Sequence, residues 1–102
     1  MVVMSVMYPS TAGAHFDFDY YVNTHIPLVR KNLGPTGLKD VQVLKGLPVE
    51  GGEPLYVAIA NLIFESPEAF GASVSGPAII EVRDDIPNFT NIEAVRQISS
   101  LS

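Results

Sequence analysis

The chain has 102 residues, of which 47% are hydrophobic and 17% charged, and its net charge is −5. This length predicts one domain over residues 1–102 with a single core. The acidic balance, with only six basic residues, argues against nucleic acid and anionic membrane surfaces as partners. The absence of cysteine excludes disulfides, thiolate nucleophiles and cysteine-based metal sites.

The first segment, residues 2–8, predicts a β-strand, because it is apolar at almost every position and Pro9 follows it. This apolar run is too short for a signal peptide and lacks the basic flank of one. No segment approaches the roughly 20 apolar residues of a membrane span. We therefore expect a cytoplasmic protein that makes no membrane contact.

Residues 17–34 follow with the pattern of an amphipathic helix. At 100° per residue, three apolar side chains fall in one narrow stripe, and His25 lies in its middle. The three are Val22, Val29 and Leu33. A titratable ring aimed at a core must be hydrogen-bonded there or face a cavity.

Pro27 lies inside this predicted helix. It removes a backbone donor and disfavours the helical region for Ile26, so we expect a kink one turn after Asn23.

The rest of the chain predicts three more strands and a second helical region. We expect strands at 38–45, 55–64 and 91–99, a turn-rich connection at 46–54, and a helix that begins at Ser66-Pro67, is interrupted at Gly76-Pro77 and continues over 78–83.

This order of elements predicts an α+β fold of the ferredoxin-like βαββαβ type. Its four-stranded antiparallel sheet carries both helices on one face. The strands at 2–8 and 55–64 are nevertheless apolar on both sides. A second copy of the chain is the simplest cover for the other face, so we predict a homodimer.

Two segments resemble the EthD family of the dimeric α/β-barrel superfamily. The first is residues 17–34, with Tyr20-Tyr21 and the run from Asn23 to Val29, and the second is the run from Asp85 to Ile92. Residues 6–9 and 97–99 fit the same pattern, so the resemblance covers nearly the whole chain.

The resemblance implies a ferredoxin-like homodimer whose two sheets form a barrel, with a ligand pocket between sheet and helices in each subunit. EthD proteins are linked to the degradation of ether fuel additives. Relatives in the superfamily include cofactor-free monooxygenases, lactone isomerases and polyketide cyclases, and others bind haem. The fold alone does not choose among these activities.

His25 is the predicted catalytic residue, as a general acid or base or as a group that polarises the substrate. The alternative is a buried neutral imidazole bonded to a carbonyl. The other candidates are substrate-binding residues: Tyr8, Tyr21, Asn61, Asn88 and Phe89.

Each of these candidates also has a structural interpretation. Tyr8 and Tyr21 are also expected as core aromatic residues. Asn61 either orients a ligand or pairs with Gln42 or Gln97 across the sheet. Asn88 and Phe89 form either a pocket rim or a turn with an aromatic plug.

The neighbouring Asp84 and Asp85 are unlike a carboxylate dyad, because adjacent side chains at a helix end diverge. One of them could accept a hydrogen bond from His25 or interact with Arg30. No metal is expected, since His15 and His25 are ten residues apart without further ligands. No cofactor is expected either, because the later helix lacks a haem-binding histidine and no glycine-rich loop precedes a helix.

The leading hypothesis is a cofactor-independent enzyme that performs isomerase, cyclase, oxygenase or oxidoreductase chemistry on a small hydrophobic carbonyl, lactone or aromatic compound. The first alternative is a non-catalytic carrier of a hydrophobic metabolite. The second is an accessory subunit of an oxygenase system that degrades ethers.

Overall fold

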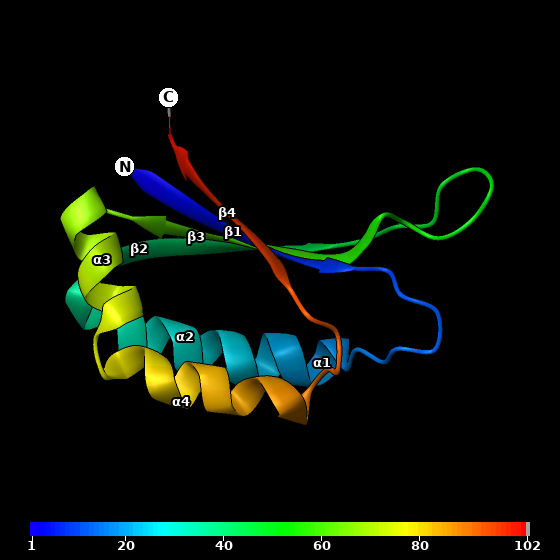
Figure 1. Ribbon diagram of the computed structural model, residues 1–102, viewed down its shortest axis with the longest axis horizontal. Helices are drawn as coiled ribbons and strands as arrows, with labels where there is room; N and C mark the ends of the chain where they lie inside the picture. Colours follow the sequence, from blue (N-terminus) through cyan, green and yellow to red (C-terminus); the bar gives the residue numbers. More distant parts are fainter. Residues whose placement is uncertain (102) are drawn as a thin grey trace.

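A computed structural model describes residues 1–101 and shows a four-stranded antiparallel sheet with helices on one face (Figure 1). The strands are β1 (Val2–Pro9), β2 (Leu38–Lys45), β3 (Tyr56–Phe64) and β4 (Val95–Ser100), in the order β2-β3-β1-β4. The helical segments are α1 (Phe18–Tyr20), η1 (Tyr21–His25), α2 (Ile26–Leu33), η2 (Gly34–Thr36), α3 (Pro67–Ser75), α4 (Ala78–Asp85) and η3 (Ile86–Asn88). This arrangement confirms the predicted ferredoxin-like α+β fold.

The first helical region begins at Asp17, whose side chain accepts a hydrogen bond from the backbone N–H of Tyr20. Its middle, η1, is a wide π-helical turn in which the N–H of Ile26 bonds to the carbonyl of Tyr21. Pro27 follows directly. Proline cannot donate to the carbonyl four residues earlier, and its ring needs extra room there. The wide turn supplies that room.

The π-helical turn corrects two sequence-based expectations. Ile26 keeps helical backbone angles, so Pro27 is accommodated by widening the helix before it. In the same turn, Tyr21 is 1% exposed, whereas Val22, which was predicted in the apolar stripe, is 39% exposed. The buried row is therefore Tyr21, His25, Val29 and Leu33, each four residues after the last, with Ile26 beside it.

The two faces of the sheet separate cleanly by register. The face toward the helices carries Met4, Val6 and Tyr8 of β1 together with Ala58, Ala60 and Leu62 of β3. Residues on the other face include Ser5, which pairs with Asn61. Figure 1 shows α2 and α4 below the sheet and no described helix above it. The core thus lies between the sheet and one helical layer.

The last strand begins at Val95 and not at Asn91 as predicted. The preceding residues have other partners: Thr90 donates its hydroxyl hydrogen to the carbonyl of His15 over 2.7 Å, and the Asn91 side chain accepts from the His15 N–H over 3.0 Å. These bonds hold the residue 10–16 loop against the end of η3 and leave the backbone at 91–94 outside the sheet. Within residues 1–101, no helix has the length and apolar character needed to cross a bilayer.

Candidate active site

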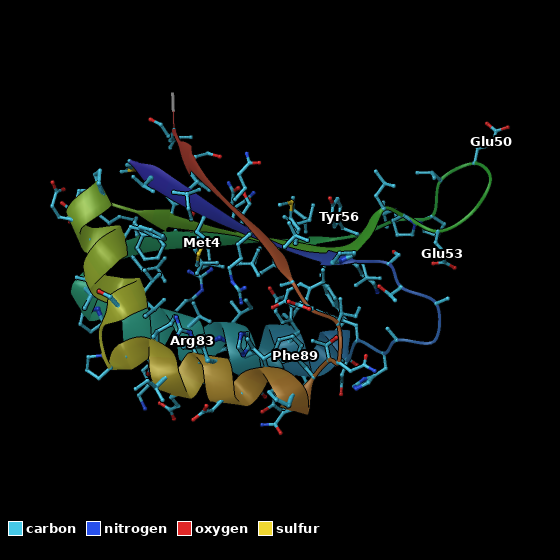
Figure 2. The ribbon with its side chains drawn as sticks, viewed as in Figure 1. Met4, Glu50, Glu53, Tyr56, Arg83 and Phe89 are labelled. Carbon is cyan, nitrogen blue, oxygen red and sulfur yellow. The ribbon has the colours of Figure 1, made fainter. Side chains whose placement is uncertain are left out.

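A cavity of about 380 Å³ lies between the helical layer and the sheet. Its walls come from β1, β3 and β4 of the sheet and from η1, α2, α3, α4 and η3 of the helical layer, and they are mostly apolar. The apolar lining includes Met4, Val6, Leu33, Leu62, Val74 and Ile79. Figure 2 shows Met4 on the sheet side, with Arg83 and Phe89 on the helical side opposite it. This volume suits a small organic molecule.

Three of the predicted site residues line this cavity together: Tyr8, Tyr21 and His25. Tyr8 comes from the sheet, while Tyr21 and His25 lie one wide turn apart on the helix. The spacing of four residues puts Tyr21 on the same face of the helical region as His25. All three are almost fully buried.

The imidazole of His25 is paired with the carboxylate of Asp85. Nδ1 of His25 lies 2.9 Å from Oδ2 of Asp85, which is the last residue of α4. Of the alternatives left open by the sequence, the bond between an aspartate and His25 is the one found. Arg30 instead lies 3.6 Å from Asp40 and donates to the carbonyl of Val41.

Two further side chains hold Asp85 in place through its other oxygen. The Tyr20 hydroxyl donates to Oδ1 over 2.6 Å, and the Asn88 amide donates to the same oxygen over 3.0 Å. Partial burial opposes ionisation of Asp85, but these bonds and the one from His25 outweigh it, so the pKa of Asp85 is lowered. Asp85 is therefore a carboxylate at neutral pH.

The charge on Asp85 determines the tautomer of His25. A carboxylate only accepts hydrogen bonds, so Nδ1 must carry the proton and Nε2 carries the lone pair of the neutral ring. Nε2 makes no hydrogen bond with any residue between 1 and 101, and His25 lines the cavity. The ring thus offers a basic nitrogen to a bound molecule.

Burial lowers the pKa of His25, while the bond to Asp85 and its charge act in the opposite direction. The imidazole is therefore neutral at pH 7 and can accept a proton. Once it does so, the charge of Asp85 stabilises the imidazolium.

The two buried phenols remain protonated over the same pH range. Burial raises the pKa of Tyr8 to about 12, although the charge of Arg96 and a bond with the Tyr21 hydroxyl oppose this. Burial, followed by the influence of Tyr8, raises the pKa of Tyr21 as well. Both hydroxyls therefore act as hydrogen-bond donors and not as bases.

Aromatic packing holds the His25 ring from behind. The ring centroids of His25 and Phe89 are 4.5 Å apart, and Tyr21 stacks on His25 with centroids 5.6 Å apart and planes at 16°. Phe89 is completely buried and also contacts Tyr8 and Tyr20. These contacts and the Asp85 bond leave the imidazole little freedom to turn, as catalysis by a positioned base requires.

The structure does not bring the other three predicted residues to the cavity wall. Asn61 lies on the opposite face of the sheet, where it accepts from the Ser5 hydroxyl over 2.7 Å and donates to Gln42 over 3.4 Å. Its predicted place in the pocket is therefore corrected in favour of the alternative, pairing with Gln42 across the sheet. Asn88 reaches the site only through Asp85, and Phe89 is a plug behind His25.

Two residues at this cavity were not identified from the sequence: Arg83 of α4 and Arg96 of β4. A signal was present for Arg96, because strand alternation places it on the same face as Ile98. For Arg83, no sequence signal distinguished it from an ordinary solvated helix residue.

The arrangement can perform acid–base chemistry on a molecule in an apolar cavity. It contains one positioned base, two phenolic donors and a carboxylate that stabilises the protonated base. Among the residues described, no three His, Asp or Glu side chains come together in a way that would hold a metal ion.

Comparison with known proteins gives both a sequence family and structural relatives. The family model described as the EthD domain matches residues 12–93. An EthD-like protein from Ralstonia eutropha JMP134 is 39% identical, with a TM-score of 0.88 over 97% of this chain and 89% of that one. A search of curated proteins found no match.

More distant structures share the fold. An ethyl tert-butyl ether D (EthD) family protein from Bacillus halodurans C-125 is 23% identical, with a TM-score of 0.78 over 100% of this chain and 99% of that one. SnoaB, a cofactor-independent oxygenase from Streptomyces nogalater, is 8% identical, with a TM-score of 0.69 over 99% of this chain and 92% of that one. At these identities the likeness concerns the fold alone.

Proposed function

This chain belongs to the EthD family, and we propose that it is a cofactor-independent enzyme that moves a proton on a small hydrophobic carbonyl, lactone or aromatic compound. The observation that carries the proposal is the pair of His25 and Asp85, whose atoms lie 2.9 Å apart at the wall of an apolar cavity. A bond of this kind leaves the second ring nitrogen basic and oriented. The fold is also that of SnoaB, an oxygenase described as cofactor-independent.

In the proposed reaction, Nε2 of His25 takes a proton from the carbon next to the substrate carbonyl. The C–H bond breaks, its electron pair moves toward the carbonyl oxygen, and an enolate forms. Tyr8 and Tyr21 donate hydrogen bonds to that oxygen, and Asp85 balances the new positive charge on the imidazole. In a substrate with a conjugated C=C bond, return of the proton from the imidazolium to the far carbon would complete an isomerisation. In a substrate with a second carbonyl, the enolate carbon would attack that carbonyl carbon, its C=O π bond would open, and the new alkoxide would take the proton back from the imidazolium, which completes a cyclisation.

The proposal predicts that the protein exchanges the acidic C–H protons of 2-tetralone, a hydrophobic ketone, in D₂O. Proton NMR follows the loss of the signal. His25→Gln should lower the enzyme-dependent rate by roughly 10²–10⁴-fold, because glutamine cannot accept the proton. His15→Gln is the matched control, since His15 is exposed and outside the cavity. Wild-type exchange at the buffer rate, or full exchange by His25→Gln with a native circular dichroism spectrum, would refute the proposal.

A non-catalytic carrier of a hydrophobic metabolite is the competing function, favoured by the apolar walls of the cavity. A carrier needs no oriented base, so His25→Gln would keep the ligand affinity of the wild type. The charged partner of His25 favours the enzyme, because burying part of a carboxylate beside a core histidine costs free energy that a simple apolar container would avoid.

We further propose that the face of the sheet opposite the helices is covered by a second copy of the chain. That face carries a central polar row of Ser5, Asn61 and Gln42, and half-buried apolar side chains flank the row. The flanking residues include Val3, Met7, Ile59 and Ile63. Partly exposed apolar side chains around hydrogen-bonded polar ones are typical of a surface that pairs with another sheet.

A further inference from the structure

Two arginines lie at the exposed margin of the 380 Å³ cavity. Arg83 comes from α4 and Arg96 from β4, so they approach the cavity from the helical layer and from the sheet. Figure 2 shows Arg83 on the helical side of the space that Met4 faces from the sheet. Both arginines are exposed, whereas the residues at the His25 end of the cavity are buried. The cavity is therefore apolar, with cations at its mouth and a base inside.

This placement of positive charge is unusual for so acidic a chain. The protein has six basic residues against 11 acidic ones, yet two of its three arginines line this one cavity. No aspartate or glutamate lines it. In residues 1–101, neither Arg83 nor Arg96 makes an ion pair, and Arg83 only donates to the carbonyl of Val74 over 3.5 Å.

The third arginine provides the contrast. Arg30 has a carboxylate 3.6 Å away and donates to the carbonyl of Val41, so its charge is used within the protein. Arg96 has no such partner, but its charge reaches the buried phenol of Tyr8. Arg96 thus acts electrostatically on the polar end of the cavity as well as on its mouth.

We propose, building on the proposed function, that the molecule bound in this cavity is amphipathic and carries an anionic oxygen group that Arg83 and Arg96 hold at the mouth. Its apolar body then lies against Val6, Leu62 and Ile79, and its reactive carbon reaches His25. Guanidinium groups favour carboxylates and phosphates, because their paired N–H donors match two oxygens at once. Arg83 and Arg96 therefore select ligands by charge, and the apolar walls select them by shape.

The test is calorimetric binding of three probes with the same chain length: octanoate, octan-1-ol and octyl phosphate, all at pH 8. Octanoate should bind roughly tenfold or more tightly than octan-1-ol, as expected for a hydrogen-bonded charge. Arg96→Gln should remove most of that difference and leave octan-1-ol affinity unchanged. Arg83→Gln should reduce the difference in the same way. Arg30→Gln is the matched control and should behave as the wild type.

The relative affinities of the three probes distinguish the possible anions. A higher affinity for octanoate than for octyl phosphate identifies a carboxylate as the anion, and the reverse order identifies a phosphate. Equal affinities for octanoate and octan-1-ol, no binding of any probe, or an equal loss in Arg30→Gln would overturn the inference. His25→Gln should keep the charge preference. If octanoate binds more tightly than octan-1-ol but tetralone exchange does not depend on His25, the proposed enzyme is refuted and the anion site stands. If exchange depends on His25 but octanoate and octan-1-ol bind equally, only the anion site is refuted.

Discussion

The two faces of the central sheet both carry apolar side chains in β1 and β3, but their surroundings in the structure differ. The inner face carries Tyr8 beside His25 and ends against a cavity. The outer face carries Ser5 and Asn61 in a hydrogen-bonded row, with no described helix over it. Shifting one residue along a strand changes which of these roles a side chain has, because the side chains alternate between faces.

The cavity lies on the inner face because the side chains of β3 differ in size between the two faces. Strand β3, one of the two middle strands, contributes Ala60 to the cavity wall, opposite Val6 of β1. Such a small side chain leaves space beneath the helices that a larger one would fill. On the outer face the same strand carries Ile59 and Ile63, which protrude. The small residue on the inner face leaves room for the cavity, and the large ones on the outer face remain half-buried within one chain.

The largest difference between the two faces is expected when neighbouring residues of β3 that point to opposite faces are truncated. Leu62→Ala on the inner face should lower the free energy of unfolding by about 3 kcal/mol at any protein concentration, because it enlarges a core cavity. Ile63→Ala on the outer face should cost less in dilute protein, since Ile63 is only half-buried within one chain. Urea unfolding monitored by circular dichroism measures both.

Concentration dependence makes the same pair a test of the homodimer. If a second copy covers the outer face, Ile63→Ala should shift the monomer–dimer equilibrium measured by sedimentation, while Leu62→Ala should not. A wild-type protein that is monomeric at micromolar concentration would contradict the dimer. If both variants lowered the free energy of unfolding equally and at every protein concentration, the two faces would not differ in burial by a second copy.

A smaller effect is expected from the polar row. Asn61→Ala removes the bond with Ser5 and the longer one with Gln42, and should cost about 1 kcal/mol. Because Asn61 faces away from the cavity, tetralone exchange and octanoate affinity should stay at wild-type values. Tyr8→Phe is the counterpart on the inner face and should lower exchange with little change in stability. If Asn61→Ala lost the exchange activity, the functional cavity would not lie on the inner face.

The sequence predicted the fold because each element has local signals, such as the cap at Asp17 and the start at Ser66-Pro67. It also singled out His25, whose ring stands alone in an apolar stripe. The sequence analysis misplaced Asn61. Alternation along a strand shows that Asn61 and its immediate neighbours point to opposite faces, but only the pairing register shows which face lies toward the helices.

Two further features could not be predicted from local periodicity. In the π-helical turn at Tyr21–His25, Val22 is 39% exposed, although a 100° periodicity placed it in the apolar stripe. The bond between His25 and Asp85 joins residues 60 positions apart through the packing of two helices. Local patterns therefore reached the catalytic candidate, but they left open whether Asp84 or Asp85 is its partner or interacts with Arg30 instead.

The smallest predicted effect is a pH dependence that belongs to the inner face alone. Burial lowers the pKa of His25 below its ordinary value of 6.5, so in the window just under 6.5 the unfolded chain binds a proton and the folded chain does not. Stability should therefore fall as the pH decreases from 6.5 toward the lowered value, whereas tetralone exchange should fall only at and below that value, where Nε2 of the folded chain becomes protonated.

Matched variants test whether His25 causes this decrease in stability below pH 6.5. His25→Gln should lose the decrease in this window, while His15→Gln should keep it. Asp85 contributes separately and only in more acidic solution, because its pKa is held below 3.8. The polar row of the outer face contains hydroxyl and amide groups that do not titrate here, so Asn61→Ala should shift the whole stability curve without changing its shape. Parallel curves for the wild type and His25→Gln would mean that the buried ring is as easily protonated as in the unfolded chain, which would contradict the lowering of its pKa by burial on the inner face.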